Sequence, residues 1–579
     1  MLKLFKRFRT RDWLFVLILC GFVVGQVYFD VTLPTYTAKT FNAMKNFSTI
    51  GEILSIGLTM LLFSIGSMAC SIVVSYIATS LAVKFSARLR RSLFSKVQSF
   101  SFEETGKFST ASLLTRSTND IQQVQMAIMM ILRMAISAPL TAVWAIVKIN
   151  ASSSELTIAS SLWIVILVTL LTTIFLLVLP KFKIVQKLTD KLNGVTRENM
   201  LGLRVVKAYN ADTYQEKKFD TVNTDLTKTN LFVNRIMGLM QPAMMLVMNG
   251  ITLTIYWLGA SLLNSNTSNL DYPTMMAFSM LVMQVLMAFM ILTMLFIMVP
   301  RASVSAKRIN EVLQTPLSIM DPLNGSEEFK TQGEIEFKNV CFKYPGAEQC
   351  ILQNISFKVK KGQTVAVIGS TGSGKSTLIN LVPRFFDATE GEVLVDGVNV
   401  KNVTQENLRK RIGYIPQKGI LFSGSVSDNI GYGVLSLSLD KMTEVASVAM
   451  ADEFIINMEG GYNAEIAQGG KNVSGGQRQR LSIARAVAIS PEIYIFDDSF
   501  SALDYTTDKA VRENLKHYTK TATSLIVAQR IGTILDADMI IVLEQGKIVG
   551  SGTHQELLHS CEVYREIALS QLSLEELGI

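Results

Sequence analysis

A glycine-rich segment in the second half of the chain carries the residue types that bind a phosphate group. It reads Gly-Ser-Thr-Gly-Ser-Gly-Lys-Ser from position 369 to 376, with an apolar run before it and another after it. Glycines at this spacing let successive backbone N–H groups turn toward one phosphate at the start of a helix. Lys375 adds a positive charge for the β- and γ-phosphates of a nucleotide, and Ser376 offers a hydroxyl to Mg²⁺. The residues predicted to bind the phosphates are Gly369, Ser370, Thr371, Gly372, Ser373, Gly374, Lys375, Ser376 and Thr377.

Further segments narrow the class of nucleotide-binding protein, because a phosphate loop alone leaves kinases, GTPases and motor proteins open. Residues 472–480 read Asn-Val-Ser-Gly-Gly-Gln-Arg-Gln-Arg, and an apolar predicted strand ends at Asp497. The run Ser-Ala-Leu-Asp at 501–504 follows, and Gln417 comes directly after another predicted strand. In this order and spacing, the segments resemble those of ATP-binding-cassette (ABC) exporters. The resemblance covers essentially the whole chain.

The resemblance implies ATP and Mg²⁺ as ligands and a role for each segment. Tyr344 would stack on the adenine, while Ser376, Gln417 and Asp497 would bind Mg²⁺. Two cassettes would pair head to tail, so that each ATP lies between the phosphate loop of one and the signature segment of the other. The signature segment comprises Ser474, Gly475, Gly476 and Gln477, and the D-loop after it comprises Ser501, Ala502, Leu503 and Asp504.

Two catalytic positions depart from the family pattern. The residue after Asp497 should be a glutamate that polarises the attacking water, but it is Asp498, whose carboxylate is withdrawn by about 1.5 Å. A misplacement of about 1 Å can slow a reaction by roughly 100-fold. The family's switch histidine is replaced by Gln529, which can hydrogen-bond a phosphate but cannot carry a proton. Because the three histidines stand elsewhere, at 517, 554 and 559, the sequence predicts ATP binding with weak hydrolysis.

The signature segment keeps the family pattern, although the chain's own catalytic positions do not, and this difference predicts a pair of unlike chains. Since each ATP site forms between two cassettes, this segment would serve the phosphate loop of a partner. The sequence therefore predicts a heterodimer of two half-transporters with one impaired and one competent site. A homodimer with two slow sites is the alternative.

The part of the chain before Pro300 is dominated by apolar stretches, in a protein that is 49% hydrophobic and only 18% charged. Six stretches reach the length of about 20 residues that a helix needs to cross a bilayer. They run from 13 to 34, 53 to 77, 127 to 147, 156 to 179, 244 to 263 and 275 to 299. The predicted fold is an all-α, six-helix transmembrane domain that is type I ABC exporter-like, followed by an α/β P-loop cassette.

The domain boundaries are placed where this pattern changes. The transmembrane domain is predicted at 1–315, a polar linker at 316–333 and the cassette at 334–579. Two long charged loops, 78–126 and 180–243, would extend the membrane helices into the cytoplasm. Within these loops, residues 108–119 and 202–211 resemble the coupling helices of the family. The alternative is that both are solvated helical hairpins.

Charge and cysteine content limit the location of the protein. Basic residues such as Lys84, Arg88 and Arg91 flank the spans, where the anionic cytoplasmic leaflet attracts them. This pattern places both termini and the cassette in the cytoplasm, and it explains the net charge of +8 without nucleic acid. Five cysteines without a CxxC pair favour neither a disulfide framework nor a zinc site. With no targeting extension recognised, a bacterial plasma membrane is the simplest location.

A methionine stripe marks the sixth span as the predicted cargo pathway. Its members, three or four residues apart on one helix face, are Met276, Met280, Met283, Met287, Met290 and Met294. Methionine is flexible and polarisable and suits surfaces that accept varied apolar ligands, although the stripe could equally pack against neighbouring helices. Arg133 in the third span could bind an anionic cargo or lie near the cytoplasmic end of the membrane.

The predicted function is ATP-driven export of hydrophobic or amphipathic compounds, with multidrug export first and lipid or lipopeptide flipping second. Peptide export is less supported, because no protease domain precedes the first span. The alternative from another class is a regulatory ATP-binding subunit that gates a partner without coupled transport. The six spans exclude a soluble cassette enzyme such as one in DNA repair.

Overall fold

The computed structural model describes residues 7–150, 154–264, 271–322, 333–434, 436–573 and 577. The chain divides into two compact units: Met1–Gln98 with Thr110–Gln314, and Ser99–Ser109 with Thr315–Ile579. The short segment 99–109 therefore belongs to the second unit, although helices of the first unit flank it in sequence. The predicted linker at 316–333 lies partly outside the described residues.

The first unit is entirely helical within its described residues. Its long helices are α2 (Thr10–Lys45), α3 (Ile50–Gln98), α8 (Ser154–Leu201), α10 (Asp212–Asn264) and α11 (Tyr272–Gln314), and the short α9 (Leu203–Ala208) joins α8 to α10. A sixth stretch consists of α5 (Thr110–Thr115), α6 (Ile121–Met130) and α7 (Ser137–Asn150), separated by π-helical segments at Arg116–Asp120 and Ile131–Ala135. These six stretches are long and apolar enough to cross a membrane.

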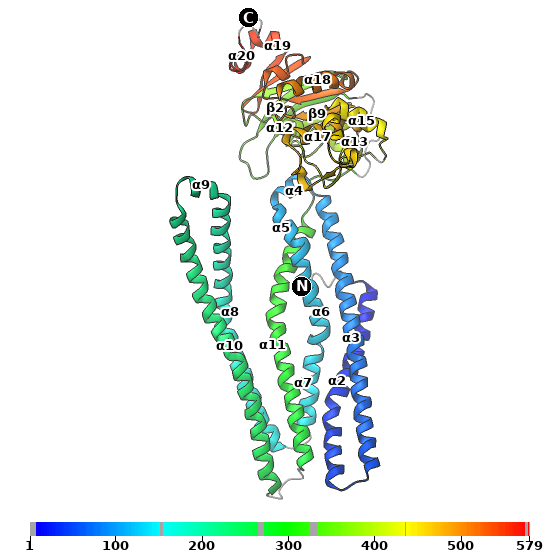
Figure 1. Cartoon of the computed structure of the whole chain (residues 1–579), viewed down its shortest axis with the longest axis vertical. Coiled ribbons are helices and arrows are strands. Elements are labelled where there is room, and N and C mark those ends of the chain that lie inside the picture. Colours follow the sequence, from blue (N-terminus) through cyan, green and yellow to red (C-terminus); the bar gives the residue numbers. More distant parts are fainter. Residues whose placement is uncertain are drawn as a thin grey trace. The chain divides into compact units, whose positions relative to one another are not determined.

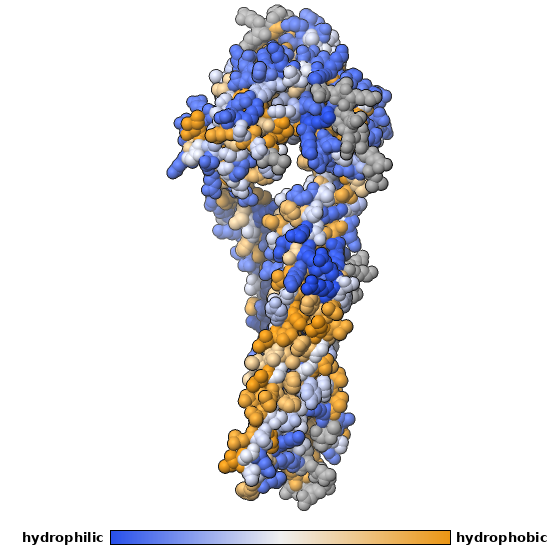
Figure 2. Space-filling model, turned by 90° about the vertical axis from the view of Figure 1, so that its right-hand side faces the viewer, coloured by the Kyte–Doolittle hydropathy of each residue, from blue (hydrophilic) through white to orange (hydrophobic). Residues whose placement is uncertain are grey.

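The long helices pack in pairs. Helix α2 lies along α3, α8 lies along α10, and α11 packs against α7, as Figure 1 shows. Many large apolar side chains point outward, among them Leu58, Leu162 and Leu253, and such residues gather over the middle of the helices (Figure 2). A surface of this kind is unfavourable in water and favourable in lipid, where a helix satisfies its own backbone hydrogen bonds.

Polar contacts fix the first π-helical segment against α11. The guanidinium of Arg116 donates to the backbone carbonyl of Arg308 at 2.6 Å and pairs with Glu311 at 3.1 Å. The Ser305 hydroxyl donates to the buried carboxylate of Asp120 at 2.8 Å. Because Arg116 and Asp120 are both buried, these contacts compensate for the loss of water around their charges.

Within its described residues, the second unit contains two large sheets and a two-stranded one. The six-stranded sheet has the order β12-β11-β3-β10-β9-β6, in which only β12 pairs antiparallel; the four-stranded sheet has the antiparallel order β2-β1-β4-β5. The strands are β1 (Ile335–Phe342), β2 (Leu352–Val359), β3 (Thr364–Gly369), β4 (Glu390–Val395), β5 (Val398–Asn399), β6 (Ile412–Ile415), β9 (Ile493–Asp497), β10 (Thr523–Val527), β11 (Met539–Glu544) and β12 (Lys547–Gly552), with β7 (Gly424–Ser425) pairing to β8 (Glu465–Ile466).

Helices cover the large sheet and form a separate helical region. They are α4 (Phe102–Lys107), α12 (Lys375–Asn380), α13 (Gln405–Lys410), α14 (Val426–Ile430), α15 (Leu439–Val448), α16 (Asp452–Ile456), α17 (Gly475–Ala488), α18 (Tyr505–Thr519), α19 (His554–Ser560) and α20 (Glu562–Leu569). Strand β9 is buried along its whole length, as expected for a central parallel strand with helices on both faces. Its carboxyl end delivers Asp497 to the same edge of the sheet as the end of β3.

Candidate functional site

The glycine-rich segment forms a loop between β3 and α12. Gly372 and Gly374 adopt positive φ angles of 84° and 100°, a conformation that other residues rarely take. A β-carbon at Gly374 would lie 2.8 Å from the Leu352 side chain, so that a larger residue would also clash. The tip of the loop is exposed at Ser370 and Thr371. The loop therefore presents its backbone at the edge of the sheet.

Lys375 folds back over this loop. Its ammonium group donates to the backbone carbonyls of Gly369 and Ser370, at 2.8 Å each. Burial lowers the pKa of Lys375, while the charges of Asp498 and Asp497 act in the opposite direction. Lys375 thus lies across the predicted phosphate site. Its present partners are neutral carbonyl groups, and a charged phosphate would bind the ammonium group more strongly.

Asp497 lies between two hydroxyl groups. Its Oδ1 accepts a hydrogen bond from Ser376 at 2.7 Å, and its Oδ2 accepts one from Tyr414 at 3.3 Å. Burial raises the pKa of Asp497, and these two hydrogen bonds only partly oppose that effect. Burial also raises the pKa of Tyr414, which therefore stays a hydrogen-bond donor. Sequence reasoning missed Tyr414, which could have been suspected from its position on the strand that leads to Gln417.

The residues present fit ATP with Mg²⁺. Ser376 and Asp497 offer oxygen ligands from one side only, as Mg²⁺ prefers when water and phosphates complete its shell. Within the described ranges, no cluster of three or more His, Cys, Asp or Glu side chains could enclose a metal ion by itself. The buried Ser373 hydroxyl oxygen has no hydrogen-bond partner among the described residues, which is consistent with a loop shaped for a ligand.

The two positions that depart from the family pattern are in direct contact. Gln417 and Gln529 each donate a side-chain amide hydrogen bond to Oδ2 of Asp498, at 3.1 Å and 2.8 Å. The backbone carbonyl of Gln529 accepts from Gln571 at 2.8 Å, and the Gln571 side chain also accepts from the N–H of Ile531 at 2.8 Å. Gln571 lies after α20, and no sequence signal would have linked it to this site.

Tyr344 lies beside the start of α12. Its hydroxyl is 3.1 Å from that of Thr377, and its ring meets the Phe386 ring edge-on, with centroids 5.3 Å apart. The ring is half-buried. The predicted adenine-binding residue is therefore connected to the phosphate loop through Thr377.

The signature segment begins helix α17. Ser474 caps the helix by accepting from the N–H of Gln477, whose side chain accepts in return from the N–H of Ser474 at 2.8 Å. A β-carbon at Gly476 would lie 3.5 Å from the Ala502 carbonyl, so that the segment adjoins the D-loop. Ser474, Ser501 and Ala502 are exposed. No contact between Ser474 or Gln477 and the phosphate loop of the same chain occurs among the hydrogen bonds of the described residues.

The D-loop connects the two carboxylates to α18. The Ser501 hydroxyl donates to the backbone carbonyl of Asp498 at 2.9 Å. Leu503 is buried, and Asp504 caps α18 by accepting from the N–H of Thr507 at 3.0 Å. The loop therefore holds the backbone of Asp498 on one side and starts a helix on the other.

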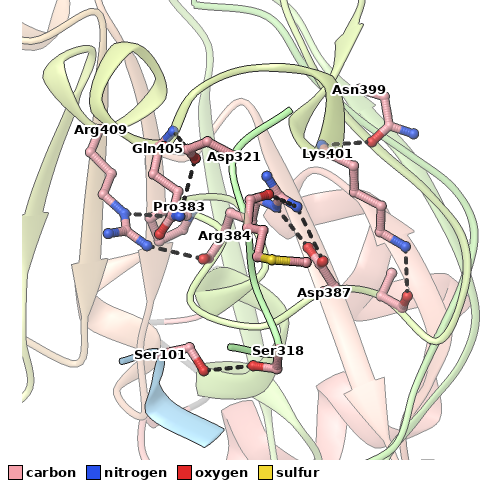
Figure 3. Close-up of polar contacts among 12 residues, drawn as sticks. Ser101, Ser318, Asp321, Pro383, Arg384, Asp387, Asn399, Lys401, Gln405 and Arg409 are labelled. Atoms are coloured by element: carbon pink, nitrogen blue, oxygen red, sulfur yellow. Dashed lines mark hydrogen bonds and ion pairs between the residues drawn. The ribbon is translucent and has the colours of Figure 1, made fainter. Parts of the chain in front are cut away.

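Helix α4 docks on the cassette. The Phe102 ring packs against Phe385, with centroids 4.8 Å apart, and reaches Phe386 at 6.1 Å. The Ser101 hydroxyl lies 2.9 Å from that of Ser318 (Figure 3). The sequence suggested residues 108–119 for such a docking segment, but the aromatic contact is made by α4, just before them. The second suggested segment, 202–211, contains α9 in the helical unit.

Glu104 of α4 forms hydrogen bonds at this docking contact. It is buried and accepts hydrogen bonds from the backbone N–H groups of Ser318 at 2.7 Å and Ser101 at 2.8 Å. Burial alone would raise the pKa of Glu104, but the hydrogen bonds from Ser101 and Ser318 lower it from 4.5 to about 2. The carboxylate thus stays ionised and ties α4 to the chain segment that enters the cassette.

Comparisons with known families agree with this arrangement. The family described as ABC transporter transmembrane region matches residues 14–315, and the family described as ABC transporter matches residues 352–501. The chain belongs to the ABC transporter family. This ABC transporter carries both family regions in one chain, as a half-transporter does, and it is a multi-pass membrane protein with a cytoplasmic cassette. The predicted fold class is confirmed.

Relatives and a solved structure extend the likeness over nearly the whole ABC chain. An uncharacterized ABC transporter ATP-binding protein of Mycobacterium tuberculosis is 38% identical over 545 residues, 93% of this chain and 93% of its own. The uncharacterized ABC transporter ATP-binding protein YfiB of Bacillus subtilis is 36% identical over 525 residues, 90% and 89% of the two chains. A structure of a bacterial Atm1-family ABC exporter with ATP bound has a TM-score of 0.80 over 97% of this chain and 98% of that chain. At 22% identity, that likeness concerns the fold alone.

Proposed function

We propose that this chain is one half of an asymmetric ABC exporter in a bacterial plasma membrane, and that its own site binds ATP but hydrolyses it slowly. The observation that carries this proposal is the contact of Asp498 with Gln417 and Gln529. Both amides donate to the same carboxylate oxygen, at 3.1 Å and 2.8 Å. An oxygen engaged by two donors polarises a water poorly, and an amide cannot relay the proton.

ATP binding rests on the residues that follow the family pattern. Lys375 and the loop backbone hold the phosphates, Tyr344 contacts the adenine, and Ser376, Gln417 and Asp497 hold Mg²⁺. The metal ion, when bound, neutralises charge on the phosphate oxygens. The 2.7 Å contact of Ser376 with Asp497 supports this role, because it brings two oxygen ligands together before any ligand arrives.

The exposed signature segment supports a second cassette as partner. Ser474 and the D-loop residues Ser501 and Ala502 face solvent in the single chain and would contact ATP held by the partner's phosphate loop. A partner with the glutamate and the histidine would supply the competent site, which favours a heterodimer. A homodimer would combine two impaired sites and turn over slowly.

The cargo is proposed to be hydrophobic or amphipathic, with multiple drugs as the first candidate class. Met280, Met287 and Met294 on α11 keep 45%, 53% and 49% of their surface exposed, so that helices of the same chain leave this face open. The other methionines of the stripe, Met276, Met283 and Met290, are half-buried. A soft apolar strip of this kind suits ligands of varied shape.

A pocket in the helical unit supports the same cargo class. It has a volume of about 220 Å³ and is lined mainly by apolar residues of α8, α10 and α11, among them Phe175, Met237 and Met240. Arg301 and Gln186 also line it, so that an amphipathic molecule with a polar end would fit. Because Arg301 and Gln186 could contact a polar headgroup, lipid or lipopeptide flipping is the second candidate function.

A regulatory subunit without coupled transport is the candidate from another class, favoured by the glutamines around Asp498.

The first experiment is a mild-detergent pull-down of the chain from its native membrane, in which the co-purifying proteins are identified and their molar ratio is measured. An equimolar second half-transporter with the glutamate and the histidine would support the proposal, and ATP-dependent uptake of a fluorescent amphiphile into inverted vesicles would support transport. A homodimer with brisk hydrolysis would contradict the impaired site, and ATP binding without uptake by any reconstituted pair would favour the regulator.

A further inference from the structure

Strand β6 brings the hydroxyl of Tyr414 to the Asp497 carboxylate. β6 pairs in parallel with β9, with Tyr414 opposite Ile495. Side chains alternate along a strand, so Asp497, two residues beyond Ile495, lies on the same face as Tyr414. The Tyr414 hydroxyl reaches Oδ2 of Asp497 at 3.3 Å and Oδ1 of Asn380 at 3.1 Å. The one hydroxyl proton is shared between these two acceptors, so Tyr414 links the Asp497 carboxylate to Asn380, the last residue of α12.

The carboxylate of Asp497 is held on both oxygens. Ser376 contacts Oδ1 at 2.7 Å, and Tyr414 contacts Oδ2 at 3.3 Å. Each contact limits rotation of the carboxylate about its last side-chain bond, whose preference is otherwise broad. Ser376 has its own predicted role with the nucleotide, so Tyr414 is the contact that can hold the carboxylate while Ser376 is engaged elsewhere.

The ring of Tyr414 packs against the ring of Phe385. Phe385 meets it edge-on, with centroids 5.3 Å apart and an interplanar angle of 75°. The Arg409 guanidinium lies 5.4 Å from the centre of the Phe385 ring and donates to the carbonyls of Pro383 and Arg384 at 3.1 Å each (Figure 3). Phe102 of α4 packs on the same Phe385 ring. Tyr414 is therefore supported by the surface on which α4 docks.

We propose that Tyr414 is a positioning residue for Mg²⁺-dependent ATP binding, because its hydroxyl keeps the Asp497 carboxylate oriented with Oδ1 beside Ser376. This inference rests on the proposed function, in which Ser376 and Asp497 hold Mg²⁺ together with ATP. It does not depend on Asp498 or Gln529, so it holds whether or not the site hydrolyses ATP.

The test is a titration of the full-length protein in lipid nanodiscs with a fluorescent ATP analogue, with and without Mg²⁺. Tyr414→Phe keeps the ring and removes only the hydroxyl. The Mg²⁺ concentration for half-maximal tightening of nucleotide binding should rise about tenfold, the lower range for losing a hydrogen bond to a charged group. Affinity measured without Mg²⁺ should stay within about twofold, because the ring still packs on Phe385.

Tyr462→Phe is the matched control, since the Tyr462 hydroxyl also donates to a carboxylate, that of Asp452, at 2.6 Å in another part of the cassette. The control should bind nucleotide with wild-type Mg²⁺ dependence. An unchanged Mg²⁺ titration in Tyr414→Phe would overturn the inference, and so would an equal weakening with and without Mg²⁺, which would indicate a purely structural role. Absence of nucleotide binding by the wild type would instead overturn the proposed function on which the inference rests.

Discussion

Two adjacent carboxylates, Asp497 and Asp498, differ in their hydrogen-bond partners, which are hydroxyl groups for Asp497 and side-chain amides for Asp498. Asp497 ends strand β9 and takes hydroxyl partners from α12 and β6, through Ser376 and Tyr414. Asp498 has a φ of +49° and takes amide partners from the segments after β6 and β10, through Gln417 and Gln529. The two carboxylates therefore draw on different residues, and in the proposed function they serve different steps, Asp497 in binding Mg²⁺ and Asp498 in hydrolysis.

The backbone at Asp498 contributes to this separation. A positive φ is uncommon outside glycine, and Asp is among the residues that tolerate it best. The turn at Asp498 directs its side chain away from the strand direction of β9 and toward the two glutamines. The backbone conformation at position 498 therefore suits the aspartate that stands there.

The largest expected effect tests whether turnover uses the signature segment of this chain. Ser474→Ala should reduce ATP hydrolysis by the purified complex about 100-fold, the scale for losing one donor to a developing charge. Ser425→Ala is the control, because Ser425 caps α14 with the same geometry away from the signature segment. Both variants should lose about 1 kcal/mol of helix-capping stability, but only Ser474→Ala should lose turnover. Normal hydrolysis in Ser474→Ala would break the assignment of this segment to a partner's site.

The next effect tests the proposed impairment of hydrolysis at Asp498 and Gln529. The double variant Asp498→Glu with Gln529→His should raise hydrolysis at this site by roughly 100-fold, since it restores both carboxylate reach and a proton carrier. Asp498→Glu alone should gain less than about tenfold, because Gln529 remains. The measurement is single-turnover hydrolysis with the partner's site inactivated. A large gain from Asp498→Glu alone would show that loss of the histidine is unimportant here.

The proposed binding of ATP phosphates by the glycine-rich loop is tested by Lys375→Ala. ATP affinity should fall about 10- to 100-fold, because charge-assisted hydrogen bonds to the phosphates are lost. Equilibrium binding of a fluorescent nucleotide measures this, with Lys547→Ala on the exposed end of β12 as the control. Equal affinity in Lys375→Ala and the wild type would mean that the loop binds no phosphate.

The smallest effect concerns the docking of α4. The folded-state pKa of Glu104 is depressed from 4.5 to about 2, so its contribution to stability is present above pH 4.5 and is lost as the pH falls toward 2. Glu104→Gln should therefore lower the unfolding free energy of the cassette by about 2 kcal/mol at neutral pH. The difference from wild type in denaturant melts should stay constant from about pH 8 to 5 and shrink below that.

Glu103→Gln is the matched control for this measurement. Glu103 is the neighbouring residue of α4 and pairs with Lys107 at 3.0 Å on the accessible side of the helix. Its replacement should change stability by less than about 0.5 kcal/mol. A difference between Glu104→Gln and wild type that did not vary with pH would argue against an ionised, hydrogen-bonded Glu104.

Much of the architecture could be predicted because its signals are local. Apolar runs long enough for a bilayer, a strand that leads into a glycine-rich loop, and the signature segment each lie within a few tens of residues. Helix α4 lies within the predicted loop 78–126, but the sequence did not single it out, because it has only six residues and its contacts with Phe385 and Ser318 are far away in the sequence. Short helices carry little periodicity, so their position depends on what they touch.

The sequence by itself determined the family and the spans, and it located the glycine-rich loop and the two positions that depart from the family pattern, since each depends on residue type and spacing along the chain. Only the tertiary structure decided that Gln417 and Gln529 meet at one oxygen of Asp498, that Tyr414 supports Asp497, and that Gln571 holds the backbone of Gln529. These contacts join residues from different strands and loops. Their formation depends on strand register and helix packing, which local sequence patterns do not specify.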